Sequence, residues 1–192
     1  MTKRAKHKPA LIETAARLFR RQGYMATGTN EILAESGAPR GSLYYYFPGG
    51  KEEIGTAAVE AAGRRVTATL QKLSDEAASP AAFVQTYVDL LIGWLEASDF
   101  RDGCPISTTL LETIPASPAI GKVGKQVFAD WTQVIATLME KHGWPAPHKG
   151  PAATFILSSI EGALILARTE QSGTPLKDVA DQLGLFLAAP PV

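Results

Sequence analysis

Residues 29–51, TNEILAESGAPRGSLYYYFPGGK, predict two short helices joined by a tight turn. The first helix, over residues 29–36, opens with Thr29, a hydroxyl residue of the kind that caps helix N-termini. Gly37 follows it, where the end of a helix favours a left-handed residue. Pro39 suits the first position of the second helix, because its missing N–H is not needed there. This spacing is typical of a helix-turn-helix.

The second helix, over residues 40–47, is unusually aromatic and exposes most of its side chains. Leu43 and Phe47 are one helical turn apart, so we expect both to pack inward. The residues left facing outward are Arg40, Gly41, Ser42, Tyr44 and Tyr45. A short exposed helix gains little by folding alone, and we therefore interpret it as the recognition helix that enters the major groove of DNA.

The charge distribution favours the same interpretation. Residues 1–51 carry 9 Lys and Arg against 3 Asp and Glu, a net charge of +6, whereas residues 52–192 carry 10 against 16, a net charge of −6. The overall net charge of zero hides a basic end on an acidic body, which suits a phosphate-binding head on a body that avoids DNA. For the stretch Lys3–Lys8 alone, a solvated tail is the alternative explanation.

Residues 10–54 resemble the DNA-binding domain of TetR-type transcriptional regulators. The matching segments are LFRRQGYMATGTNEIL, GAPRGSLYYYF and KEEI. The sequence APRGSLYYYFPGGKEEI, together with GCPI further on, is similar to the LmrA/YxaF-like branch of the family. Two features depart from the broad family pattern. Three residues separate Phe47 from Lys51, which that branch shares, and Tyr46 stands where a His is more common.

The candidate base contacts follow from the recognition helix itself. Arg40 is its only long cationic side chain, so we expect a bidentate contact to guanine. Tyr44 and Tyr45 would contact thymine methyl groups or phosphates. Gly41 lets the backbone come close to DNA, and Ser42 lies beside it on the outward face.

The resemblance adds four further positions. It implies phosphate contacts by Thr29, Tyr46 and Lys51, and it makes Asn30 a position that sometimes reads a base. For Tyr46, packing under the helix is the alternative to a phosphate contact. The partner that these residues imply is double-stranded operator DNA containing an inverted repeat, because a helix-turn-helix dimer reads two half-sites.

The rest of the chain is also expected to be helical, with no convincing strand. We predict an all-α fold of about nine helices, in which residues 1–50 form a three-helix DNA-binding domain and residues 51–192 form a larger helical effector-binding and dimerisation domain. The expected helices outside the motif cover residues 8–22, 51–73, 80–97, 104–113, 117–142, 151–171 and 175–187, with a loop over residues 143–151.

Composition places the chain in the cytoplasm. There is no run of about 20 apolar residues that would span a membrane. The basic N-terminus lacks a following apolar core and is not a secretory signal. The single cysteine, Cys104, excludes an intrachain disulfide.

The last two helices are expected to form the interface of a homodimer. The eighth carries apolar residues on more than one face, so it must be buried on more than one face. Two such helix pairs related by a two-fold axis would form a four-helix bundle. The alternative is that both helices are buried inside one subunit. The predicted interface residues are Ile156, Ile160, Ala163, Leu164, Ala167, Val179, Leu183 and Phe186.

The helical body is expected to bind a small-molecule effector. Aromatic residues over residues 80–142 are spaced so that some would face an interior site, although plain core is the alternative for each of them. The candidate residues are Tyr87, Trp94, Cys104, Thr109, Phe128 and Trp131. Because a thiol at a helix N-terminus has a lowered pKa, Cys104 is also a candidate redox or electrophile sensor, with a structural or pocket-lining role as the alternative.

No enzymatic function, metal or cofactor is expected. His7, His142 and His148 lie in the basic tail and around one loop, and with Cys104 they match no metal spacing. The sequence therefore predicts a homodimeric, ligand-responsive DNA-binding regulator, most simply a repressor. Two rivals remain: a non-specific architectural DNA binder, against which the acidic body argues, and a small all-α enzyme, against which the missing catalytic residues argue.

Overall fold

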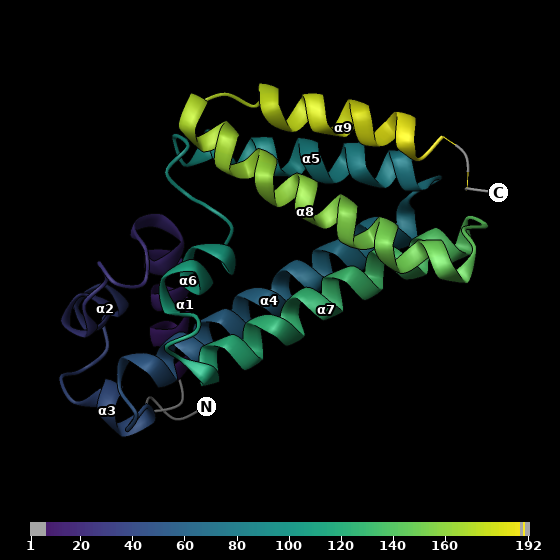
Figure 1. Cartoon of the computed structure of the whole chain (residues 1–192). Helices are drawn as coiled ribbons and strands as arrows, with labels where there is room; N and C mark the ends of the chain where they lie inside the picture. The colour runs from purple at the N-terminus through teal and green to yellow at the C-terminus, as the bar shows by residue number, and fades with distance from the viewer. Residues whose placement is uncertain (1–6, 189, 191–192) are drawn as a thin grey trace. The chain divides into compact units, whose positions relative to one another are not determined.

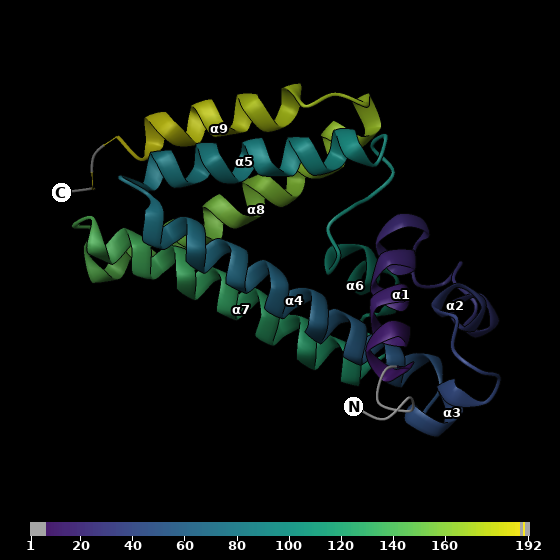
Figure 2. The same cartoon turned by 180° about the vertical axis from the view of Figure 1, so that it is seen from behind.

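The computed structural model describes residues 7–188 and 190, and this part of the chain is helical without a strand. The first six residues, with the basic Lys3, Arg4 and Lys6, lie outside the described part. The expected all-α fold is confirmed (Figures 1 and 2). The helices in the described part are α1 His7–Gln22, α2 Thr29–Ser36, α3 Ser42–Tyr46, α4 Lys51–Glu76, α5 Pro80–Ala97, α6 Ser107–Thr113, α7 Pro118–Lys141, α8 Ala146–Glu170 and α9 Thr174–Phe186.

The helices form two compact units that divide the chain differently from the expected boundary after residue 50. The first unit is Met1–Arg65 together with Cys104–Val127, and the second is Val66–Gly103 together with Phe128–Val192. The long helices α4 and α7 each run through both units. The boundary differs because α6 packs on α1, and the first part of α7 lies against α4 and α6.

A single apolar cluster holds the N-terminal helices together. It takes one face of α1 and one or two side chains from each of the following elements. Tyr24 packs at its edge, with its ring centroid 5.1 Å from that of Phe19. The fully buried members include Leu11, Phe19, Ile32, Leu43, Phe47 and Ile54.

Glycines allow α7 to lie unusually close to its neighbours within the first unit. A Cβ on Gly63 of α4 would overlap the side chain of Val127, and a Cβ on Gly124 of α7 would overlap Leu110 of α6. At these two positions a larger residue would require the facing side chain or the helix to shift.

The second unit is built from α5, α8 and α9 with the remaining parts of α4 and α7. α9 packs on both α5 and α8 (Figure 1). Gly173 allows the start of α9 to lie against Ile92 of α5. Ser79 caps α5, since its hydroxyl accepts a hydrogen bond from the backbone N–H of Ala82 at 3.1 Å, and Pro80 follows at the first position, as predicted.

The turn of the helix-turn-helix differs from its expected form. α3 begins at Ser42, not at residue 40, because Gly41 has a left-handed backbone with φ 86° that cannot belong to a helix. Pro39 consequently lies in the turn, where its carbonyl accepts from the N–H of Ser42 at 3.0 Å. Gly28 occupies the cap position of α2, so the predicted cap at Thr29 is wrong. The left-handed Gly37, with φ 64°, is confirmed.

Two later helices also begin elsewhere than expected. α8 starts at Ala146, so most of the predicted loop over residues 143–151 is helical and Pro151 lies inside the helix. Pro147, and not Pro151, is the proline in the first turn of α8. α6 starts at Ser107, three residues after Cys104, so the thiol is not at the helix N-terminus.

Two glycine substitutions test the close approach of α4 and α7. We expect Gly63→Ala to lower the free energy of unfolding by about 1–3 kcal/mol, because the new methyl group overlaps Val127. Gly93→Ala is the matched control in α5, where a Cβ meets nothing within 4 Å, and it should raise stability by about 0.5–1 kcal/mol. Urea unfolding at one fixed protein concentration measures both. Equal stability of the two variants would contradict the packing at Gly63.

Candidate nucleic-acid interface

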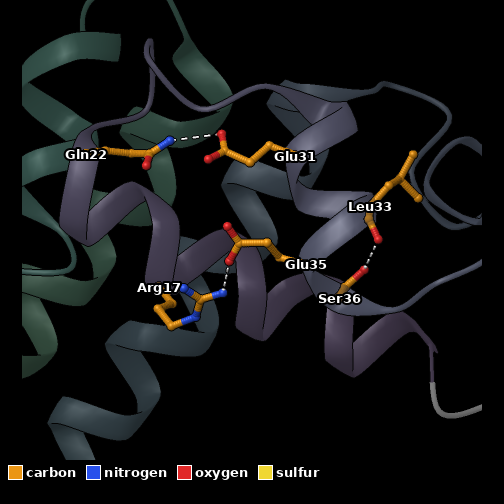
Figure 3. Close-up of polar contacts among 6 residues, drawn as sticks. All are labelled: Arg17, Gln22, Glu31, Leu33, Glu35 and Ser36. Carbon is orange, nitrogen blue, oxygen red and sulfur yellow. Dashed lines mark hydrogen bonds and ion pairs between the residues drawn. The ribbon is translucent and has the colours of Figure 1, made fainter.

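Polar contacts fix the relative register of α1 and α2 (Figure 3). Arg17 of α1 forms an ion pair with Glu35 of α2, and the side-chain amide of Gln22 donates to the carboxylate of Glu31 at 2.9 Å. These groups are exposed, and exposed ion pairs contribute little to stability. Their effect is to select one arrangement of two helices that the apolar cluster already holds together.

The side chains of α3 divide into a buried and an exposed set, as predicted. Leu43 and Phe47 are 0% and 1% exposed and join the apolar cluster. Tyr44 and Tyr45 are 60% and 68% exposed. Tyr46 is half-buried against the same cluster, and its ring meets that of Tyr45 edge-on at 4.9 Å. Packing under the helix is therefore part of the role of Tyr46, and its phosphate contact stays a prediction.

Arg40 and Gly41 lie in the turn before α3 and not on the helix itself. Arg40 is exposed, and a Cβ on Gly41 would meet nothing within 4 Å. Ser42 is half-buried as the first residue of the helix. The N-terminal residues of a recognition helix contact the base edges. Arg40 lies just before the N-terminus of α3 and is therefore at the end of the helix where such contacts are expected.

The remaining candidates lie at the starts of α2 and α4. Asn30 is exposed and Thr29 is half-buried. The ammonium of Lys51 lies 3.3 Å from the backbone carbonyl of Met25 and 4.5 Å from the centre of the Tyr24 ring. Lys51 thus reaches the turn between α1 and α2, which no pattern in the sequence indicated.

Burial and neighbouring charges shift two titratable groups here. Partial burial lowers the pKa of Lys51, and the carboxylate of Glu112 acts in the opposite direction. Burial raises the pKa of the Tyr24 phenol, and the carboxylate of Glu52 adds to this rise. Lys51 is therefore a cation held in a partly desolvated place by groups of its own chain. Within the described residues, no group of three or more His, Cys, Asp and Glu side chains is arranged to hold a metal ion.

The candidate effector residues fall into both units. Tyr87 and Trp131 are buried in the second unit, where the Trp131 ring meets that of Phe128 edge-on at 5.5 Å. Trp94 of α5 is 43% exposed and so lies outside the buried core, and its part in effector binding stays a prediction. Cys104 and Thr109 are buried in the first unit, at 8% and 0% exposure.

Most of the predicted interface residues are buried inside the subunit. They lie on the inner face of α8 and on α9, and side chains this well covered have no surface left for a second copy. We therefore correct their assignment to the dimer interface. The buried residues are Ile156, Ile160, Ala163, Leu164, Ala167 and Leu183. Val179 is half-buried and Phe186 is 42% exposed.

The outer face of α8 carries a second set of apolar side chains. Phe155, Ile165 and Leu166 are 50%, 60% and 53% exposed. The Phe155 ring packs edge-on against that of Phe186, with centroids 5.3 Å apart, which extends this face onto α9. By length and composition alone α8 could cross a membrane, with a mean hydropathy of 1.5 over its most apolar window, but a helix that is apolar on both its core face and its outer face passes the same test.

The head thus has the form of a helix-turn-helix DNA-binding protein, and comparison with known proteins identifies its class. Residues 11–58 match the family of bacterial regulatory proteins called tetR, and residues 80–182 match the C-terminal domain of LmrA/YxaF-like transcriptional regulators. The chain therefore belongs to the TetR family of transcriptional regulators, in its LmrA/YxaF-like branch. It is a DNA-binding regulator and not an enzyme.

Individual relatives are similar over nearly the whole chain. The HTH-type transcriptional regulator YxaF of Bacillus subtilis (strain 168) is 36% identical over 187 residues, which cover 97% of this chain and 98% of that protein. LmrA of the same organism is 33% identical over 173 residues, covering 88% and 90%. The crystal structure of the regulatory protein TetR from Rhodobacter sphaeroides superposes with a TM-score of 0.81 at 25% identity, covering 93% of this chain and 97% of that one.

Replacing Arg40 tests the base-reading assignment. We expect Arg40→Ala to lower the affinity for the preferred DNA sequence by about 1–3 kcal/mol, the usual contribution of one bidentate arginine–guanine pair. Arg64→Ala is the matched control, since Arg64 is an exposed arginine of the same unit whose guanidinium pairs with Glu60 at 2.7 Å within α4. Fluorescence anisotropy with matched and mismatched duplexes measures both. If Arg40→Ala still discriminates between matched and mismatched duplexes as wild type does, Arg40 does not contact a base.

Proposed function

We propose that the protein is a homodimeric repressor that occludes a promoter and leaves its operator when a small molecule binds the helical body. The observation that carries the dimer is the apolar outer face of α8. Large exposed apolar patches mark interaction sites on soluble proteins. A second copy related by a two-fold axis would cover this face with the identical face of its partner.

The composition of the outer face supports close helix packing. Ser158 and Gly162 lie on it, and a Cβ on Gly162 would meet nothing within 4 Å, so a second helix can approach the backbone there. We assign the interface to Phe155, Ile165, Leu166 and Phe186, in place of the inner-face residues that the sequence suggested. In this bundle α8 would be buried on both faces, which accounts for its apolar character all round.

Operator binding would use the basic head of each copy. Two heads placed by the dimer would enter successive major grooves of an inverted repeat. We assign base contacts to Arg40 and Asn30, close backbone approach to Gly41 and Ser42, and contacts to phosphate or thymine methyl groups to Tyr44 and Tyr45. Thr29, Tyr46 and Lys51 complete the phosphate contacts. A regulator of this class works where the chromosome lies, in the cytoplasm.

Thr109 supports an effector site in the helical body. Its side chain is 0% exposed, and its hydroxyl is without a hydrogen-bond partner in the structure. A buried hydroxyl without a partner costs free energy, which a polar ligand atom would recover. Cys104, five residues earlier in the chain and buried in the same unit, remains a candidate for the apolar part of effector recognition. In the second unit, Tyr87, Phe128 and Trp131 remain separate candidates for effector contact.

The dimer is tested by placing a charge on the outer face of α8. We expect Leu166→Glu to convert the protein to a monomer, because the carboxylate would be desolvated in the interface. Leu111→Glu is the control, since Leu111 is 73% exposed on α6 and outside the proposed interface. Light scattering across a concentration series gives the mass of both. A dimer that survives Leu166→Glu would exclude this face.

Thr109→Val tests the effector site. Val keeps the shape of Thr but removes the unpartnered hydroxyl, so we expect the thermal stability of the free protein to stay equal or to rise. A compound that releases wild-type protein from DNA should bind this variant more weakly. Such a compound is found by screening for release of labelled operator. Calorimetric titration then measures its affinity for the wild-type protein and for the variant. Equal affinity for both proteins would place the effector elsewhere.

The experiment for the whole proposal is binding to the protein's own upstream DNA with scrambled competitor across a salt series. A preference of about 1,000-fold or more that persists near ~0.15 M salt supports an operator-binding regulator. Equal binding to both duplexes that disappears steeply with salt would support non-specific architectural binding instead. Release of the specific complex by a small molecule would support the effector response.

A further inference from the structure

Glu112 of α6 holds the turn between α1 and α2 from a distant part of the chain. Its carboxylate accepts a hydrogen bond from the backbone N–H of Met25 at 2.6 Å, across 87 residues of sequence. A hydrogen bond between a carboxylate and a backbone N–H is stronger than one between neutral groups. Glu112 is the only acidic residue of α6, and the neighbouring Leu111 is exposed to solvent.

Lys51 of α4 also binds this turn. The Met25 carbonyl lies 3.3 Å from the Lys51 ammonium, so both backbone polar groups of Met25 are bound by side chains from other elements. Within the turn, the buried hydroxyl of Thr27 donates to the Gly23 carbonyl at 2.7 Å. Three backbone polar groups of the turn, the N–H and C=O of Met25 and the C=O of Gly23, are thus hydrogen-bonded to side chains.

Gly23 makes room for the Glu112 carboxylate. Its φ of +92° is left-handed, and a Cβ at this position would overlap the carboxylate group. A second contact of the same kind lies nearby, where the Ser117 hydroxyl donates to the carboxylate of Glu52 in the first turn of α4. The segment from α6 to the start of α7 is thus hydrogen-bonded both to the turn before α2 and to the first turn of α4.

The turn leads directly into α2, whose first residues are candidate DNA contacts. Gly28, at the cap position of α2, connects this turn directly to Thr29 and Asn30. From this geometry we infer that Glu112 is a positioning residue for operator recognition, which acts through Met25 and does not touch DNA. The inference rests on the operator binding proposed above.

The sign of a substitution separates positioning from simple electrostatics. Glu112 is an anion in a unit that binds a polyanion, so removing its charge alone should strengthen binding to any DNA. Loss of positioning should weaken binding to the operator only. Glu112→Ala removes the charge and the acceptor, whereas Glu112→Gln removes the charge and keeps a carbonyl acceptor for Met25.

The experiment compares these two variants with Leu111→Ala, the matched truncation one residue earlier. The probes are a duplex selected from a random pool by the wild-type protein and a scrambled duplex of equal length. We expect Glu112→Ala to bind the selected duplex roughly 10-fold more weakly, the effect of losing about one charged hydrogen bond, with scrambled binding unchanged or tighter. Glu112→Gln should bind the selected duplex at least as tightly as wild type, and Leu111→Ala should match wild type.

Hydrogen exchange of the Met25 amide gives an independent readout on the free protein. It should be protected in wild type and in Glu112→Gln and should exchange rapidly in Glu112→Ala. Three outcomes overturn the inference: operator binding by Glu112→Ala equal to or tighter than wild type, equal weakening by the Gln and Ala variants, or parallel loss on both duplexes. Failure of the wild-type protein to select any duplex would instead refute the proposed function.

Discussion

The burial of Leu43 and Phe47 is the interaction on which the recognition segment depends. With five residues, α3 is too short to persist in water, because helix nucleation is unfavourable. Leu43 of α3 and Phe47, which directly follows it, are 0% and 1% exposed in the cluster formed with α1 and α2, and burial of such a side chain contributes about 1.5–3 kcal/mol. An exposed ion pair such as that of Arg17 and Glu35 contributes only about 0–1 kcal/mol. Hydrophobic packing therefore holds α3 in place with its tyrosines exposed. The polar contacts between α1 and α2 select the register of those two helices.

The eighth helix joins the fold of the subunit to its proposed assembly. Its inner face, with Ile156 and Ile160, is in the core, and its outer face, with Phe155 and Leu166, is exposed. Its apolar residues predicted that it is buried on more than one face. Which face belongs to the core cannot be read from the sequence, because both faces have helical spacing and similar composition. Only the packing of α9 against α5 and α8 decides it.

Local signals predicted the elements well and their ends less well. Gly37 and Pro80 were placed correctly, because their backbone preferences act within a few residues. Thr29 and Pro151 were misplaced, because Gly28 and Pro147 offered the chain equivalent starts a residue or more earlier. The contact of Glu112 with Met25 had no signal at all: a single glutamate on a short helix has no pattern, and its partner is a backbone N–H 87 residues away.

The position of α6 is defined on two sides by glycines. On one side Leu110 packs against Gly124 of α7, and on the other the Glu112 carboxylate lies against Gly23 and bonds to Met25. These two attachments respond differently to displacement. Apolar contact is non-directional and weakens gradually, whereas a hydrogen bond weakens steeply as its length and angle change. A small shift of α6 would therefore leave the packing of Leu110 on α7 largely intact, but it would break the hydrogen bond between Glu112 and Met25. The Glu112 carboxylate, and not Leu110, therefore makes the turn before α2 sensitive to the position of α6.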